Sequence, residues 1–412
     1  TEFTDFSGMG YTEAFDAMIE MMRNEYAFTE FKGIDWDAMV TEFRPRFEEA
    51  EANEDSTAYF LAVRDFEWSI PDTHIGSNAF NGLVDLFFEE TDGGLGLAIR
   101  KLDDGSVIVN YLMDGGPAAE AGIEMMSEIL EVNGQAIGDA IDASVPWSSP
   151  FSSDHFRQLQ QLRYVIRFPV DTEVKLLYKN PGADGAVTVT LTTIAERDSF
   201  GFSSFNVGLT GFELPLEFEV LDSGYGYIKI YGFNDDNLLT LTLWQRAIRN
   251  FNAAGIHGLI IDMRQNGGGS PDIGNVMLGS FIDEELYAGT SAFYFADIDD
   301  FAFDENYETV ITPAGEEDRY YGDVTVLIGP NCISMCEFFT YALALNDRAQ
   351  VVGQYPTAGG GGGIKTYAMP DGIFAQFTVG RGVGADNEIH IEGTGVVPTV
   401  QVPVTEETLF SE

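Results

Sequence analysis

Ser334 stands where a serine hydroxyl could act as a nucleophile. Residues 324–330 form a short apolar run typical of a buried strand, and residues 338–345 form a second apolar run that favours a helix. Ser334 is therefore expected at a tight strand-to-helix junction, beside unpaired backbone N–H groups. Acyl transfer to a hydroxyl needs such fixed donors for the developing oxyanion. Taken alone, a serine at a helix start fits an N-cap better, because that is its commonest role there.

A second segment with chemical potential runs from Asp262 to Gly269 and ends in three consecutive glycines. It follows an expected buried strand at 258–262 and precedes an expected helix at 271–282. Glycines let the backbone approach a ligand closely and leave N–H groups exposed. The spacing is neither that of a phosphate-binding loop nor that of a dinucleotide fingerprint. The segment alone fits a turn as well as a site.

The two cysteines, Cys332 and Cys336, flank Ser334. Two cysteines are too few for a disulfide scaffold. They either form a bridge across the first helical turn or lie as two small buried side chains, and we expect the second arrangement. With no further cysteine and only four histidines, a structural zinc site is not expected.

The charge of the chain excludes some classes of partner. There are 67 acidic and 21 basic residues among 412, a net charge of −46. This balance argues against nucleic acid and anionic membranes as partners. It suits a solvated acidic surface in salty surroundings, where counterions screen self-repulsion. No run is long and apolar enough to span a bilayer. A leader is expected to have been removed before Thr1.

Three parts are predicted along the chain. Residues 1–88 show helical periodicity, residues 89–198 read as short strands and turns, and residues 199–412 alternate strands and helices. The last pattern is typical of a sheet covered by helices. Residues 147–168 are aromatic-rich and have no clean period, so we interpret them as an insertion. The predicted fold is thus a multidomain α/β protein.

Six segments come in one order along the chain: 226–230, 262–269, 331–337, 348–353, 356–357 and 392–398. Their order and spacing resemble one peptidase family, the C-terminal processing (tail-specific) proteases and their tricorn-core relatives. The resemblance covers about residues 200–404. It implies a ClpP/crotonase-like serine-peptidase core in which Ser334 is the nucleophile. It also implies an oxyanion hole formed by the Met335 N–H and a glycine of the 267–269 loop, Gly267 or Gly268.

The same family explains the middle part as a PDZ-like β domain. Segments 116–123 and 129–134 match the strand and turn pattern of such a domain. PDZ domains bind peptide C-termini by strand addition and hold the carboxylate in a backbone nest. The usual Gly-Asp pair after the 121–123 turn is absent, and the 147–168 segment falls where the groove helix would lie. The resemblance assigns peptide binding to Gly94, Leu95, Gly96 and Leu97.

The general base separates the two branches of the family. The processing branch uses a lysine after its Pro-Thr segment, and no lysine stands at the matching place after Thr357; Lys365 lies further on and is expected in a loop. The tricorn-like branch uses a Ser-His pair before the PDZ domain, with a glutamate near the C-terminal end. His74, with Thr73 in place of the serine, and Glu392 match that arrangement.

These matches define the expected roles. His74 would take the proton from Ser334, because its pKa lies near neutrality. Glu392 and the Thr73 hydroxyl would orient the imidazole ring and stabilise its cation. His390 is the backup base, because an expected strand would place it on the same side as Glu392.

The resemblance implies a serine endopeptidase that needs no cofactor or metal and cleaves peptides or unfolded protein tails. A homo-oligomer fits the family, as does a periplasmic, secreted or membrane-attached location. The alternative is an inactive relative that binds peptides or other ligands, and a scaffold is a second rival. The acidic segment 297–305 lacks the spacing of an EF-hand, so we interpret it as a solvated loop and not as a calcium site.

Overall fold

The computed structural model describes residues 3–233 and 237–410, which form two compact units. The first unit contains residues up to 82, 150–153 and 210–401, and the second contains 83–149, 154–209 and residues from 402 onward. The N-terminal helices and the α/β core therefore share one unit. The predicted three-part division at residues 88 and 198 stays a prediction. Within the described ranges, no helix has the length and apolar character needed to cross a bilayer.

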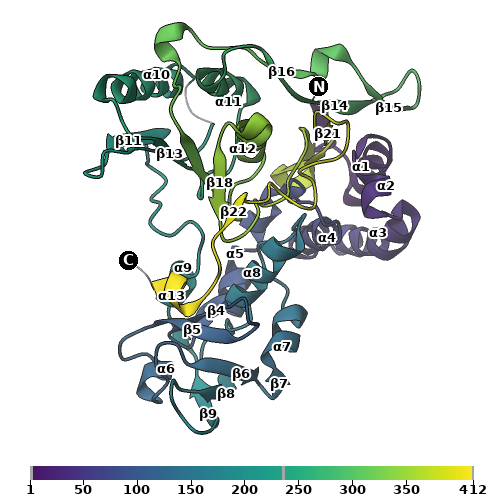
Figure 1. The fold of residues 1–412 in the computed structure, drawn as a ribbon. Helices are drawn as coiled ribbons and strands as arrows, with labels where there is room; N and C mark the ends of the chain where they lie inside the picture. Colours follow the sequence, from purple (N-terminus) through teal and green to yellow (C-terminus); the bar gives the residue numbers. More distant parts are fainter. Residues whose placement is uncertain (1–2, 234–236, 411–412) are drawn as a thin grey trace. The chain divides into compact units, whose positions relative to one another are not determined.

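A six-stranded sheet forms the centre of the first unit, in the order β11-β12-β13-β17-β18-β22 (Figure 1). All neighbours are parallel except β11 and β12. Alternate residues of β12, β13 and β17 are buried, as the period of two requires when one face packs on a core. The strands are β11 (Leu216–Val220), β12 (Gly226–Ile230), β13 (Leu259–Asp262), β17 (Val324–Leu327), β18 (Gln350–Gly353) and β22 (Val400–Gln401).

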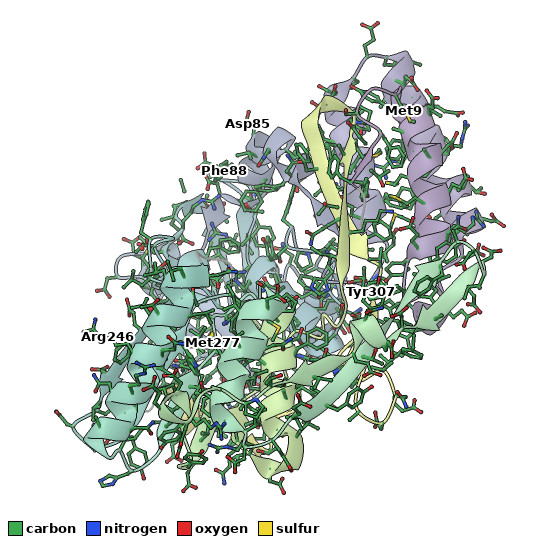
Figure 2. The ribbon with its side chains drawn as sticks, turned by 90° about the horizontal axis from the view of Figure 1, so that it is seen from above. Met9, Asp85, Phe88, Arg246, Met277 and Tyr307 are labelled. Atoms are coloured by element: carbon green, nitrogen blue, oxygen red, sulfur yellow. A yellow bond between two sulfur atoms is a disulfide. The ribbon has the colours of Figure 1, made fainter. Side chains whose placement is uncertain are left out.

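Three helices contribute to the hydrophobic core around this sheet: α10 (Asn237–Ala254), α11 (Pro271–Leu278) and α12 (Met335–Ala344). α10 and α11 each have a buried and an exposed face, whereas no residue of α12 is exposed. Figure 2 labels Arg246 on α10, which is exposed, and Met277 on α11, which is buried. The sequence predicted these helices to within a few residues, because their apolar period is clear.

The N-terminal helices pack on a second sheet of the same unit. The helices are α1 (Tyr11–Glu25), α2 (Thr29–Lys32), α3 (Trp36–Ala52) and α4 (Ser56–Trp68), and the sheet order is β1-β19-β20-β2. Aspartates cap two of them: Asp35 accepts two N–H bonds at the start of α3, and Asp55 accepts one at the start of α4. The sheet consists of β1 (Thr4–Asp5), β2 (Gly76–Ser77), β19 (Ile364–Met369) and β20 (Ile373–Thr378).

A third sheet in this unit is built on the long strand β14 (Leu286–Phe295). It pairs antiparallel with β15 (Asp300–Phe303), β16 (Thr309–Ile311) and β21 (Arg381–Val383). A bulge interrupts the β14–β16 register between Tyr287 and Gly289.

The second unit is a five-stranded antiparallel path, β4-β5-β6-β8-β9, with β7 paired to β6 and a separate β3–β10 pair. Within the 147–168 segment, where the sequence shows no clean period, residues Asp154–Tyr164 form helix α8 with a buried face. The elements are α5 (Val84–Thr91), β3 (Gly93–Gly94), β4 (Leu97–Lys101), β5 (Val107–Leu112), α6 (Pro117–Glu120), β6 (Glu128–Val132), β7 (Gln135–Ala136), α7 (Ile137–Ala143), α8, β8 (Glu173–Lys179), β9 (Val187–Thr192), β10 (Ile194–Ala195), α9 (Asp198–Phe202) and α13 (Glu406–Phe410).

Candidate active site

Three loops of the first unit meet at one edge of the central sheet. Strands β13, β17 and β18 are neighbours and run parallel, so the segments that follow them leave from the same side. These segments are the glycine loop ending at Gly269, the turn that carries Ser334, and the stretch 357–361. The topology therefore gathers motifs that lie far apart in the sequence.

Ser334 occupies a strained backbone position at the start of α12. Its φ is 58° and its ψ is −123°, a region that residues with a side chain rarely adopt. Its side chain is only partly buried, and its own N–H donates to Glu337 Oε2 at 3.0 Å. A serine that served only as a cap would keep extended dihedrals. The geometry favours a partly exposed hydroxyl on a sharp strand-to-helix turn, as nucleophiles require.

Glu337 holds this turn and the 357–361 loop together. Its buried carboxylate accepts four hydrogen bonds, from Ser334 N–H, Thr357 Oγ1, Gly359 N–H and Gly360 N–H, at 2.6–3.0 Å. Burial raises the pKa of Glu337 to about 7, and the four hydrogen bonds act in the opposite direction. All four groups donate, so the arrangement suits the ionised carboxylate.

The glycine loop lies so close to the Ser334 turn that Gly268 has no room for a side chain. A Cβ on Gly268 would lie 2.6 Å from Ile333 O, 2.8 Å from Ser334 Cβ and 3.1 Å from Met335 N. The φ of Gly268 is +93°, which only glycine adopts without strain. Its N–H, however, donates to Asn266 Oδ1 at 2.8 Å. Gly268 thus provides space at the Ser334 turn, and its N–H is already committed within the loop.

His74 reaches the same place from the N-terminal part of the unit. Its Cε1, Ile333 Cγ2 and Glu337 Oε2 all lie within 3.5 Å of the point where a Cβ on Gly360 would stand. The residue is buried, and Gln376 Nε2 donates to its carbonyl at 3.1 Å. No hydrogen bond joins His74 and Ser334 among the described residues. The two residues thus lie at the same part of the site without a hydrogen bond between them. Hydrogen bonds between catalytic groups are often long before substrate binds.

Asp72 orients the segment that carries His74. Its Oδ1 accepts the His74 N–H at 2.8 Å, and its Oδ2 accepts hydroxyls from Tyr26 and Thr378. Burial lowers the pKa of the His74 imidazole, the charge of Asp72 opposes this, and the charge of Lys32 adds to it. A histidine with a lowered pKa is neutral at pH 7 and can accept a proton.

Glu392 lies in the same buried cluster, in a turn and not on the strand expected from the sequence. Its Oε2 accepts the Gly361 N–H at 3.0 Å, and its Oε1 pairs with Lys32 Nζ. Burial raises the pKa of Glu392 to about 8; Asp72 adds to this, and Lys32 opposes it. In the structure, the carboxylate bonds Lys32 and Gly361, whereas His74 Nδ1 has no hydrogen-bond partner in the described residues.

Thr73 is engaged with a short segment from the middle of the chain. Its N–H donates to Ser152 Oγ and its Oγ1 accepts the Ser152 N–H, both at 2.9 Å. The hydroxyl of the neighbouring Ser153 donates to Ala358 O at 2.6 Å. Thr73 therefore anchors the 150–153 segment beside the site, and these bonds go to Ser152 and not to the His74 ring.

The remaining candidates separate clearly. His390 packs edge-on against Phe338 and Tyr341 of α12, and burial lowers its pKa to about 4. Lys365 is not a loop residue, since it lies on β19 and pairs with Glu25 at 2.6 Å. The contacts of His390 and Lys365 do not put either residue beside Ser334.

Cys332 and Cys336 form a disulfide across the Ser334 turn. Our expectation of two separate thiols was therefore wrong. The sequence offered both arrangements, and the helical start at Met335 brings the two Cα atoms to 5.3 Å, within the range a disulfide needs.

The predicted peptide-binding loop of the second unit is not an open nest in the structure. Gly94, Leu95, Gly96 and Leu97 are all buried. A Cβ on Gly94 would meet Glu196 Oε1, the partner in a buried ion pair with Arg167 at 2.7 Å. Peptide binding at this loop stays a prediction.

Several site residues had no assigned role in the sequence interpretation. Lys32 lies in a short N-terminal helix and Ser152 in a segment without period, so neither carries a local signal. Thr357 belongs to one of the segments that carry the resemblance and Asp72 lies two residues before His74, but their hydrogen-bond partners are distant in sequence. Asn266 is fully buried, and its Nδ2 has no hydrogen-bond partner among the described residues.

Comparison with known proteins agrees with this arrangement. Residues 224–402 match the model of peptidase family S41, residues 10–57 match the tricorn protease C1 domain, and residues 83–144 match the PDZ domain. The resemblance to tail-specific proteases with tricorn-like features is thereby confirmed, as is the predicted combination of a helical segment, a PDZ domain and an α/β core.

Relatives are distant in sequence. The carboxy-terminal processing protease CtpA of Bacillus subtilis is 23% identical over 330 residues, which cover 79% of this chain and 58% of that protein. A probable CtpA-like serine protease of Staphylococcus aureus is 24% identical over 310 residues, covering 75% of this chain and 52% of that protein. The chain therefore spans a little over half the length of these curated relatives.

Solved structures show the same fold. A crystal structure of mature CPAF is 17% identical, with a TM-score of 0.68, covering 97% of this chain and 94% of that one. A putative peptidase from Parabacteroides merdae is 15% identical, with a TM-score of 0.53, covering 97% and 91%. At such identities the likeness concerns the fold.

Proposed function

We propose that this chain, whose residues 224–402 are a domain of peptidase family S41, is a serine endopeptidase with Ser334 as nucleophile and His74 as general base. The observation that carries the proposal is the meeting of the strained Ser334 turn, the buried His74 ring and Gly268 at one edge of the sheet. None of these features is needed for a helix cap. Together they supply a hydroxyl, a neutral base and a closely approaching backbone.

The reaction is acyl transfer followed by hydrolysis. Ser334 Oγ attacks the peptide carbonyl carbon while His74 accepts the hydroxyl proton, and the imidazolium then protonates the leaving amine. A water molecule attacks the resulting ester with His74 again as base, which releases the carboxylate and regenerates Ser334. Because no hydrogen bond joins Ser334 and His74 in the described part of the chain, the proposal includes a small shift of the His74 segment when substrate binds.

The oxyanion is stabilised by backbone donors of the Ser334 turn and the glycine loop. The N–H of Met335 lies at the start of α12, where the helix dipole favours negative charge. The Gly268 N–H is committed to Asn266 Oδ1, so Gly267 is the preferred second donor of the two glycines predicted. Gly268 then acts by allowing the two backbone segments to meet.

Glu392 and Thr73 support His74 indirectly. Asp72 places negative charge beside the imidazole, which stabilises its cation during the reaction, and Glu392 holds Lys32 against the segment that carries His74. Thr73, through Ser152, fixes the backbone next to His74. Both are positioning residues in this proposal.

The proposed substrates are peptides or unfolded protein tails. An extended chain suits an edge-of-sheet site in a protein that also carries a PDZ domain. Following the named relatives, which are processing proteases, we assign the chain to the periplasm, the cell exterior or the membrane surface. A homo-oligomer remains part of the proposal.

One observation favours the alternative of a non-catalytic peptide-binding relative. The His74 ring makes no hydrogen bond with Ser334 in the described residues, and the carboxylate of Glu392 is taken by Lys32 and Gly361. The non-catalytic alternative requires that His74 and Ser334 stay apart in every state of the protein, also when a peptide is bound.

Active-site labelling distinguishes the two. The protein is incubated with a fluorophosphonate, which phosphonylates activated serines, and the adduct is located by mass spectrometry. The proposal expects a single adduct on Ser334 that is lost in His74→Ala. A His390→Ala variant is the matched control and should label as wild type does. Absence of labelling on Ser334 in folded wild-type protein would favour the binding relative.

A further inference from the structure

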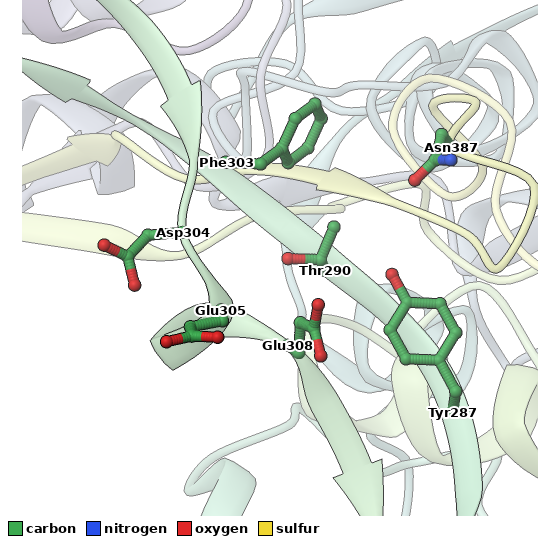
Figure 3. Close-up of a pocket in the computed structure, with 7 residues that line it drawn as sticks. All are labelled: Tyr287, Thr290, Phe303, Asp304, Glu305, Glu308 and Asn387. Carbon is green, nitrogen blue, oxygen red and sulfur yellow. The ribbon is translucent and has the colours of Figure 1, made fainter.

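A pocket of about 460 Å³ lies on the β14 sheet of the first unit and shares no residue with the candidate active site (Figure 3). Its size falls within the range of small-ligand sites, roughly 300–1,000 Å³. Strand β14, the end of β15 with the segment that leads to β16, and the loop after β21 surround it. Its lining includes Tyr287, Thr290, Phe303, Asp304, Glu305 and Glu308, and Asn387 completes it.

The lining is acidic and aromatic. Asp304, Glu305 and Glu308 contribute three carboxyl groups, and no lining residue is basic. Asp304 Oδ1 is used within its own turn by Asn306. Because the chain has a net charge of −46, three neighbouring acidic residues are not by themselves evidence of a binding site.

Thr290 supplies the independent observation. The residue is 8% exposed, and its Oγ1 is buried with no hydrogen-bond partner among the described residues. Buried hydroxyls are almost always paired, because an unpaired one costs free energy. Figure 3 shows the hydroxyl pointing toward the side of the pocket where Asp304 and Glu305 lie. A ligand with an N–H donor would satisfy it.

The backbone explains why this hydroxyl is held there. The bulge between Tyr287 and Gly289 interrupts the pairing of β14 with β16, and from Thr290 onward β14 pairs with β21 instead. A bulge changes the direction of the side chains that follow it. Thr290 therefore points into the pocket as a consequence of rigid sheet structure.

We propose that this pocket binds an organic cation, a guanidinium or primary ammonium group with an apolar stem. The carboxylates of Glu305 and Glu308 form charge-assisted hydrogen bonds with its N–H groups, and Thr290 Oγ1 accepts one more. The rings of Tyr287 and Phe303 contact the stem and the cation face. A metal ion is disfavoured, because no group of three or more ligating side chains in the described chain is placed to hold one.

Two sources share this chemistry, a basic side chain of a polypeptide and a free polyamine. Binding is measured by calorimetry at constant ionic strength with Nα-acetyl-arginine amide and with spermidine, and the complex is mapped by NMR shifts of threonine methyl groups. The Ser334→Ala protein is used, so that binding is read without cleavage. The result is thus independent of the proposed peptidase activity.

Paired variants make the test specific. Glu305→Gln/Glu308→Gln removes two pocket charges, and Glu284→Gln/Glu285→Gln removes two exposed charges of the same unit outside the pocket. We expect about tenfold weaker binding in the first variant and unchanged binding in the second. Thr290→Val removes the unpaired hydroxyl with its shape retained, so we expect weaker binding together with an unchanged or higher Tm.

Each outcome decides the proposal. Tighter binding of the arginine derivative assigns the site to a polypeptide side chain, and tighter binding of spermidine assigns it to a polyamine. Equal weakening in both double-glutamine variants would mean nonspecific counterion attraction and would overturn the proposal. So would the absence of a shift at the Thr290 methyl when ligand is saturating.

Discussion

The ammonium group of Lys32 pairs with the carboxylate of Glu392 inside the protein, where the two side chains are 6% and 0% exposed. The same ammonium also donates to the carbonyl of Pro71, which lies just before the segment that carries His74. One buried cation thereby ties the C-terminal turn to the histidine segment. Its charge lowers the pKa values of both His74 and Glu392.

Replacing Lys32 should therefore shift the pH dependence of activity. In Lys32→Met the positive charge is gone, so the pKa of His74 rises. Activity is lost when the base is protonated, and the acid limb of the kcat/KM profile should move to higher pH. Unchanged limbs in a folded variant would show that Lys32 has no electrostatic effect on the base. The control is Lys365→Met, which removes another ion-paired lysine and should leave the profile where it was.

The glycine loop offers a test in which neighbouring residues should behave differently. A methyl on Gly268 would lie 2.6 Å from Ile333 O, and its φ of +93° is strained for alanine. Gly268→Ala should lower kcat/KM by about 100-fold or more, because a displacement near 1 Å has that effect at an active site. Gly267 has nothing within 4 Å of an added Cβ, and alanine retains its N–H. Gly267→Ala should stay within a few-fold of wild type; equal losses in both would contradict the geometry.

Glu337 should stabilise the fold as well as the site. Glutamine cannot accept the N–H bonds of Ser334, Gly359 and Gly360 with both of its terminal atoms. Glu337→Gln should therefore lower the free energy of unfolding by about 2–4 kcal/mol. The control is Glu13→Gln, which occupies the same third helical position in α1 but is exposed. Chemical denaturation compares them, and similar small losses would refute the role of Glu337.

The sequence predicted most residues of the candidate site, but not the hydrogen bonds and ion pairs that join them. Ser334, the glycine loop and the edge of the sheet follow from local periods and glycine placement. His74 and Glu392 came only from resemblance, because a lone histidine and one acid among 67 have no local signature. Lys32 and Ser152 could not be found, since their roles depend on contacts between distant segments. The prediction of a strand around His390 was wrong for the same reason. His390 lies outside any strand and Glu392 lies in a turn, and both are held by contacts with distant segments.

Helix α8 shows a different limit. Its sequence, residues 154–164, buries Phe156 and Leu159 but also Gln160 and Gln161. The buried glutamines break the apolar period, so the sequence alone does not predict this helix. Tertiary contacts, such as the bonds of Gln161 Nε2 to the carbonyls of Asp142 and Ser144, determine its face.

Stability should fall as pH rises above the acid range. Burial raises the pKa of Glu67 to about 8. A carboxyl whose folded pKa is raised contributes stability that is full below about pH 4.5 and is lost as pH rises through the folded value. Glu67 alone changes the free energy of unfolding by at most about 1.4 kcal/mol per pH unit in that window.

Glu67→Gln isolates this contribution, because Glu67 lies outside the candidate site. Thermal unfolding between pH 5 and 8 should show a shallower decline in Tm for the variant than for wild type. General repulsion among the many surface acids is the same in both proteins. Parallel curves would mean that Glu67 is ionised in the folded protein throughout this range.

The most direct test of the central claim is hydrolysis of an unfolded protein substrate across a range of salt concentrations, with wild type, Ser334→Ala and His74→Ala compared. The account predicts cleavage by wild type and its loss in both variants, with circular dichroism showing that both remain folded. Cleavage that persists in His74→Ala but not in Ser334→Ala would contradict the assigned base. Cleavage that persists in Ser334→Ala would contradict the nucleophile and the mechanism with it.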